Sequence, residues 1–67
     1  MSADHKKDLL RLLGDKPLAG TEQQLEVLYQ RIQGLVQLNG EHWVQRHCEQ
    51  LRDEWERLLQ MGYPVED

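Results

Sequence analysis

The fold is decided by residues 21–61, TEQQLEVLYQRIQGLVQLNGEHWVQRHCEQLRDEWERLLQM. Two apolar stripes with helical spacing run through this stretch, one on each side of Asn39-Gly40. Because apolar residues that recur every three or four positions line one face of an α-helix, the stretch predicts two amphipathic helices. Asn and Gly both accept positive φ and commonly end helices, so the dipeptide predicts a reversal of direction. The predicted fold class is all-α, dominated by a long antiparallel helical hairpin.

The first arm of the hairpin is predicted at residues 22–38. Thr21 and Gln24 form a capping-box pattern, in which each side chain can bond the backbone amide of the other residue. The apolar stripe of this arm consists of Leu25, Leu28, Tyr29, Ile32, Leu35 and Val36.

The second arm is predicted as one continuous helix over residues 41–61. Gly62 favours a C-terminal cap and Pro64 stops the helix, so residues 63–67 are predicted to be a disordered tail. Across the hairpin, Leu28, Ile32 and Leu35 are expected to face the apolar arc of this arm. That arc is centred on Val44, Cys48, Leu51, Trp55 and Leu58.

A short helix is predicted before the hairpin, at residues 4–13, ending at Gly14. It places Leu9, Leu12 and Leu13 on one side, and at about ten residues it is too short to be stable alone, so it must dock. Residues 1–67 are therefore predicted to form a single small three-helix domain. Two arrangements stay open: the short helix closes a monomeric bundle, or two hairpins dimerise into a four-helix-type bundle.

Composition and charge narrow the class of protein. A chain of 67 residues has a marginal core of its own. The net charge of −4 and the lack of a basic face argue against phosphate binding, so nucleic acid is not an expected partner. A lone Cys48 favours a reducing compartment, and no apolar run is long enough for a membrane span. We expect a cytoplasmic protein that does not enter the membrane.

No group of residues predicts a reaction or a metal site. A helical zinc pair needs ligands three or four residues apart, and neither His42, His47 nor Cys48 has such a partner. His47 and Cys48 are adjacent, so their side chains point about 100° apart on a helix and cannot form a catalytic pair. We expect Cys48 to be buried and unreactive, and we assign no catalytic residue, metal ligand or cofactor. A metal- or cofactor-binding protein that joins His5, His47 and Cys48 is kept as an alternative.

Association with another protein is the predicted function, in the sense of a small intracellular interaction module: a regulator, an adaptor or an assembly chaperone. Gly34 lies inside a helix, where it costs about 1 kcal/mol relative to Ala, and it shares one side with Val27 and Leu38. Trp43 and Trp55 add more apolar surface than a short helix can cover. These five residues are the candidate interaction surface, and the expected partner is a second copy, or else an unidentified protein.

Two alternative functions that involve nucleic acid are retained beside protein association. A nucleic-acid-associated regulator would use the basic edge at Lys6, Lys7, Arg11 and Lys16. An acidic mimic would instead occupy the basic nucleic-acid site of a partner.

Overall fold

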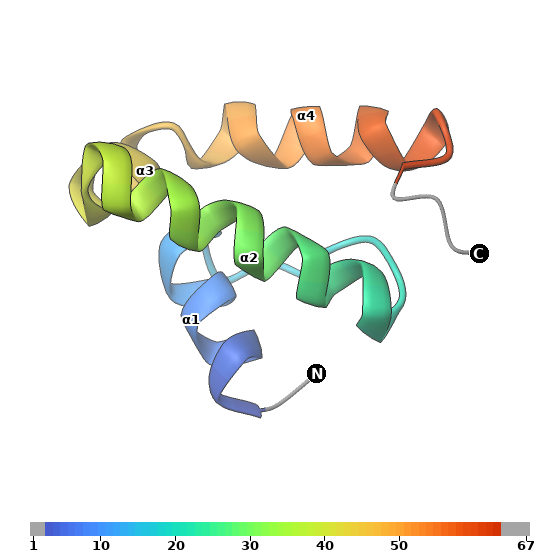
Figure 1. The fold of residues 1–67 in the computed structure, drawn as a ribbon, viewed down its shortest axis with the longest axis horizontal. Helices are drawn as coiled ribbons and strands as arrows, with labels where there is room; N and C mark the ends of the chain where they lie inside the picture. The colour runs from blue at the N-terminus through green and yellow to red at the C-terminus, as the bar shows by residue number, and fades with distance from the viewer. Residues whose placement is uncertain (1–2, 64–67) are drawn as a thin grey trace.

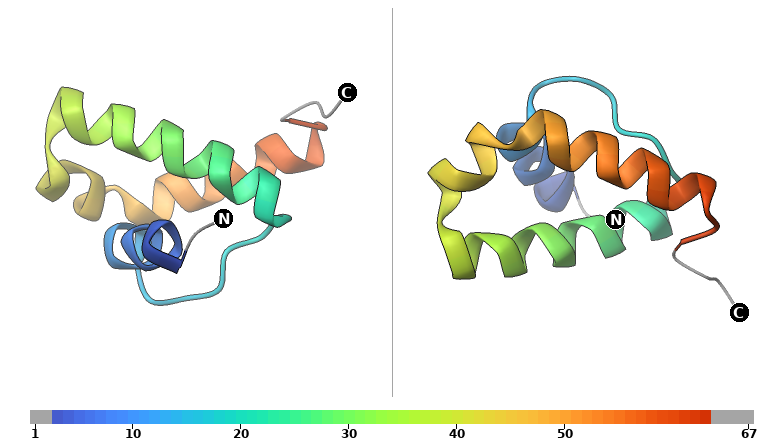
Figure 2. Two further views of the ribbon diagram at one scale, coloured as in Figure 1. Left: turned by 60° about the horizontal axis from the view of Figure 1, so that its bottom comes forward. Right: turned by 90° about the horizontal axis from the view of Figure 1, so that it is seen from above.

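Residues 3–63 are described by the computed structural model, and they form four helices and no strand. The helices are α1 (Ala3–Leu13), α2 (Glu22–Asn39), α3 (Glu41–Arg46) and α4 (Cys48–Gln60), which confirms the all-α prediction. Figure 1 shows that α2 and α4 run in opposite directions. Figure 2 shows α1 on one side of this pair. No helix in the described part of the chain has both the length and the apolar character to cross a bilayer.

The predicted ends of α2 are confirmed. The Thr21 hydroxyl accepts a hydrogen bond from the Gln24 amide at 3.2 Å, and the Thr21 amide donates to the Gln24 side chain at 2.8 Å. At the other end the turn depends on Gly40, whose φ of 93° lies in the left-handed region that side chains disfavour. Asn39 remains helical, so glycine alone supplies the positive φ of the turn.

The second arm of the hairpin is divided at His47, which corrects the prediction of one continuous helix over 41–61. The His47 backbone N–H donates to the carbonyl oxygens of Trp43 and Val44 at 3.1 and 3.2 Å. Its ring Nδ1 lies 2.7 Å from the same Trp43 oxygen, and the two rings stack with centroids 4.2 Å apart. The backbone of His47, with φ −104° and ψ 15°, departs from helical values, so α3 stops at Arg46 and α4 begins at Cys48. Apolar periodicity continues across the break and does not reveal it.

The core lies where α1 docks on the other helices. The three leucines predicted to face inward from α1 are fully buried, and α1 packs against α2, α3 and α4. Leu35, Leu51 and Leu58, which were also predicted to meet across the hairpin, are only half-buried. The hairpin is thus filled mainly from the α1 side. The fully buried side chains among the described residues are Leu9, Leu12, Leu13, Leu28, Ile32, Val44 and Trp55.

Two side chains of α4 hold the loop that joins α1 to α2. The Arg52 guanidinium donates to the carbonyl oxygens of Leu13, Lys16 and Pro17 at 3.0, 3.1 and 2.7 Å. The Trp55 indole N–H donates to the Ala19 carbonyl at 2.9 Å. Carbonyl groups at the end of a helix and in a loop have no helical partner, so these bonds satisfy acceptors that would otherwise depend on water.

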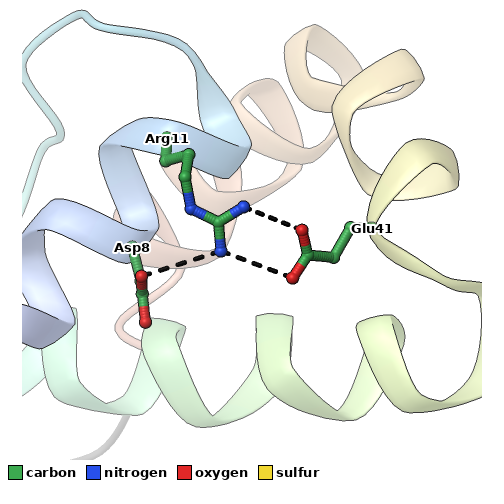
Figure 3. Close-up of polar contacts among 3 residues, drawn as sticks. All are labelled: Asp8, Arg11 and Glu41. Atoms are coloured by element: carbon green, nitrogen blue, oxygen red, sulfur yellow. Dashed lines mark hydrogen bonds and ion pairs between the residues drawn. The ribbon is translucent and has the colours of Figure 1, made fainter.

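A surface ion pair joins α1 to the start of α3 (Figure 3). The Arg11 guanidinium contacts both carboxylate oxygens of Glu41, at 2.7 and 3.4 Å, and lies 3.7 Å from Asp8. The hydrogen bond and the charge of Arg11 lower the pKa of Glu41, and the same contacts raise the pKa of Arg11. Both side chains are exposed, so this pair orients the helices more than it stabilises them.

The last described residue is attached to α4. The Tyr63 amide donates to the Leu58 carbonyl at 2.9 Å, and its ring meets Trp55 edge-on with centroids 6.5 Å apart. The rest of the predicted disordered tail, residues 64–67, lies outside the described residues.

Candidate interaction surface

An ion pair between Arg31 of α2 and Glu54 of α4 marks the side of the hairpin that faces away from α1. On α2, the α1 residue His5 contacts Glu26 and Tyr29, which lie about 140 to 160° from Arg31 around the helix. On α4, the residue that bonds the end of α1 lies about 160° from Glu54. The pair therefore spans α2 and α4 on the side that α1 leaves uncovered.

Three of the predicted surface residues lie on this side of α2. Val27, Gly34 and Leu38 all fall within about 60° of Arg31 at helical spacing. Val27 is half-buried, whereas Leu38 is 83% exposed. Gly34 is exposed, and a Cβ built there meets nothing within 4 Å. Among residues 3–63, therefore, no other helix approaches the glycine.

The corresponding side of α4 is apolar as well. Leu51, Leu58 and Met61 lie within about 60° of Glu54, and Met61 is 81% exposed. Leu58 and Met61 line a shallow cavity of about 470 Å³ beside Glu54 and Arg57. We call the combined surface the open face. It consists of Val27, Arg31, Gly34, Leu35 and Leu38 on α2, of Leu51, Glu54, Arg57 and Leu58 on α4, and of Met61 directly after α4.

The two tryptophans lie elsewhere. Trp55 is 2% exposed and belongs to the core, so it contributes nothing to the surface of the chain. Trp43 lies on α3, half-buried, with its ring against His47. Of the five predicted residues, the structure brings Val27, Gly34 and Leu38 together and leaves the tryptophans apart.

The α4 half of the open face was missed by sequence reasoning. Leu51 and Leu58 were assigned to the interior of the hairpin, and Met61 was not among the predicted surface residues. The opposite charges of Arg31 and Glu54 are visible in the sequence and could have suggested this face. Their pairing, however, depends on the packing of α2 against α4, which the sequence alone does not give.

Charge is distributed unevenly around α4. On the open face Arg31 and Glu54 neutralise each other, and the exposed Arg57, about 60° from Glu54, adds one positive charge. The exposed acidic residues Glu49, Asp53 and Glu56 lie about 100 to 160° from Glu54, on the outer side of the helix. The excess of acidic residues that gives the chain its net charge of −4 therefore lies outside the open face.

The histidines and the cysteine do not converge. His5 is engaged with Glu26 at 2.9 Å and stacks on Tyr29 with ring centroids 3.9 Å apart, whereas His47 is engaged with Trp43. Within residues 3–63, no three His, Cys, Asp or Glu side chains are grouped closely enough to hold a metal ion. Cys48 is half-buried and packs against the core, less enclosed than expected.

The residues of the predicted basic edge lie in different environments. Arg11 is paired with Glu41, while Lys6 and Lys16 line a cavity between α1 and the following loop.

Comparison of the chain with models of known protein families, with curated proteins and with solved structures gives no match. The function must therefore be argued from the geometry.

Proposed function

We propose that the protein is a cytoplasmic protein-binding module that acts without catalysis, and that it assembles as a homodimer through the open face. One observation carries the proposal: Leu38 and Met61, more than four-fifths exposed, lie at the two ends of a face on which half-buried leucines adjoin the Arg31–Glu54 ion pair. Large exposed apolar residues grouped on one face are characteristic of an interaction site.

The distribution of charge favours a second copy of the chain as the partner that binds the open face. Two molecules of net charge −4 repel each other, and they approach most easily through the surface with the least unpaired charge. The open face has no unpaired acidic residue, because Glu54 is paired with Arg31 and because Glu49, Asp53 and Glu56 point away from it. A contact between two identical faces is also the commonest symmetry of protein dimers.

The helices are suited to such a contact. Each copy would contribute α2 and α4, and the four helices would bury the half-exposed leucines at their centre, as in a four-helix bundle. Gly34 would let a helix of the second copy approach the α2 backbone closely. A chain this small has a marginal core, so the added burial would stabilise it.

Sedimentation equilibrium tests the proposal with one pair of variants. Leu38→Glu places a charge on the open face and should leave a monomer at concentrations where the unaltered protein is a dimer. Gln37→Glu adds the same charge at the neighbouring exposed position, about 120° from Arg31 around α2, and should remain a dimer. A monomer mass for the unaltered protein up to millimolar concentration would reject the homodimer. A dimer that survives Leu38→Glu would reject the open face as its interface.

A further inference from the structure

A second hollow lies on the other side of the molecule. It is a cavity of about 530 Å³ bounded by α1, the loop over residues 14–21 and the start of α2. In Figure 2 this loop bows away from the helices as it passes from α1 to α2. The cavity is lined by Lys6, Leu9, Leu10, Asp15, Lys16, Pro17, Leu18, Gly20, Glu22 and Leu25.

The loop is held in this position by α4. Arg52 donates to the carbonyl oxygens of Lys16 and Pro17 at 3.1 and 2.7 Å, and Trp55 donates to that of Ala19 at 2.9 Å. These anchors lie in the middle of the loop and fix its path before any ligand arrives. A ligand would therefore meet a preformed wall, and would not lose affinity to the ordering of a mobile loop.

The wall of the cavity is apolar and its charged groups include two cations. Leu10, Leu18 and Leu25 are half-buried and line the interior. The ammonium groups of Lys6 and Lys16 form no ion pair or hydrogen bond within residues 3–63. An enclosed apolar surface with a few polar groups is the usual form of a small-molecule site, and such sites occupy about 300 to 1,000 Å³.

The charges favour an anion. Asp15 and Glu22 also line the cavity and balance the formal charge of the two lysines, but Glu22 takes part in another interaction, whereas both ammonium groups are unbonded within residues 3–63. The N-terminus of α2, an 18-residue helix, is at the same place, and its partial positive charge adds to that of the lysines. The occupant that matches these features has an anionic head and an aliphatic body.

We propose that this cavity binds medium-chain aliphatic carboxylates, with the carboxylate at Lys6 and Lys16 and the chain against Leu10, Leu18 and Leu25. The lysines supply charge-assisted hydrogen bonds to the head, and burial of the chain supplies most of the affinity. Each buried methylene tightens binding by up to about fourfold, so the site discriminates by chain length. This site is separate from the open face and does not depend on dimerisation.

The test is a titration followed by amide chemical shifts in two-dimensional NMR, with octanoate, hexanoate and octylammonium as probes. Octanoate should shift the amides of residues 14–25, and hexanoate should bind up to about fifteenfold more weakly, because two methylenes are lost. Octylammonium should not bind there. Lys6→Gln and Lys16→Gln should each weaken octanoate by about fivefold, the size expected for one exposed charge pair.

Lys7→Gln is the matched control, because Lys7 is exposed on α1 and does not line the cavity. It should bind octanoate as the unaltered protein does, and its spectrum shows that loss of one α1 lysine leaves the fold intact. The proposal is overturned if millimolar octanoate shifts no amide of the loop, or shifts the open face instead. It is also overturned if octylammonium binds equally well, or if Lys7→Gln weakens binding as much as Lys6→Gln.

Discussion

The two sides of the α2–α4 pair are built differently. On one side α1 inserts three fully buried leucines, and Arg52 and Trp55 bond the loop that follows α1. On the other side the only bonded contact between described residues of α2 and α4 is the Arg31–Glu54 ion pair. The leucines of the open face are half-buried at positions 35, 51 and 58 and exposed at position 38.

The difference shows where the stability of the monomer resides. A small chain has enough apolar residues to close one side of a helical pair, and here the short N-terminal helix does so. The uncovered side is then available for another molecule, and substitutions there should affect association more than folding. Four changes test this division.

The largest effect is expected at Leu9, which is 0% exposed. Leu9→Ala leaves a cavity at the centre of the closed side and should lower the free energy of unfolding by about 2 to 5 kcal/mol, enough to unfold a marginal domain. Leu38→Ala on the open face should change it by less than about 0.5 kcal/mol in solution dilute enough to keep the protein monomeric. Urea unfolding followed by circular dichroism measures both. Equal losses would mean that the two sides do not differ.

Arg52→Ala should have the next largest effect, a loss of about 1 to 3 kcal/mol, because three carbonyl oxygens lose a charged donor. Arg57 is the matched control, since it is an exposed arginine of α4 with no hydrogen bond or ion pair to another described residue. Arg57→Ala should stay within about 0.5 kcal/mol. Hydrogen exchange should localise the Arg52 effect to residues 14–20, and no change in loop protection would contradict the anchoring role.

Gly34→Ala should have the opposite sign and stabilise the monomer by about 0.5 to 1 kcal/mol, because the site is helical and a Cβ there meets nothing within 4 Å. Gly40→Ala should destabilise, since Gly40 has a φ of 93°. If the second copy packs on Gly34, the same Ala should weaken the dimer while it raises monomer stability. Unfolding and sedimentation on one sample separate the two effects, and a stabilised monomer with an unchanged dimer would place Gly34 outside the interface.

The smallest effect is expected for the pH dependence of the Arg11–Glu41 pair. The pKa of Glu41 is lowered in the folded state, mainly by its hydrogen bond to Arg11. Its stabilisation is therefore complete above the unfolded pKa and is lost as the pH falls through the lower folded value. Glu41→Gln should reduce the urea midpoint slightly near neutral pH and leave it unchanged in strong acid. Glu49→Gln, at an exposed carboxylate outside any ion pair with described residues, should show no such difference.

The features that could be predicted from the sequence depend on residues that are close in the chain. The capping box uses Thr21 and Gln24, the turn needs the glycine at position 40, and the inward leucines of α1 follow from spacing alone. The same spacing grouped Val27, Gly34 and Leu38 on one side of α2. These parts needed no knowledge of tertiary packing.

The features that could not be predicted depend on backbone carbonyls or on packing between helices. Arg52 and Trp55 bond to carbonyl oxygens of the loop, and every residue type carries such an oxygen, so the sequence contains no mark of the acceptor. The break at His47 is accompanied by another such contact, between the His47 ring and the Trp43 carbonyl oxygen. Trp55 was predicted both in the apolar arc that faces α2 and on the interaction surface, and its burial agrees with the first prediction and not with the second.

The Arg52 and Trp55 anchors also bear on the order in which the protein can fold. Their acceptors precede them by 35 to 39 residues. Because synthesis proceeds from the N-terminus, a nascent chain that ends at Asn39 already carries the sequences of α1 and α2 and none of the donors that fix the connection between them. These bonds can therefore fix the connection between α1 and α2 only after α4 has been synthesised.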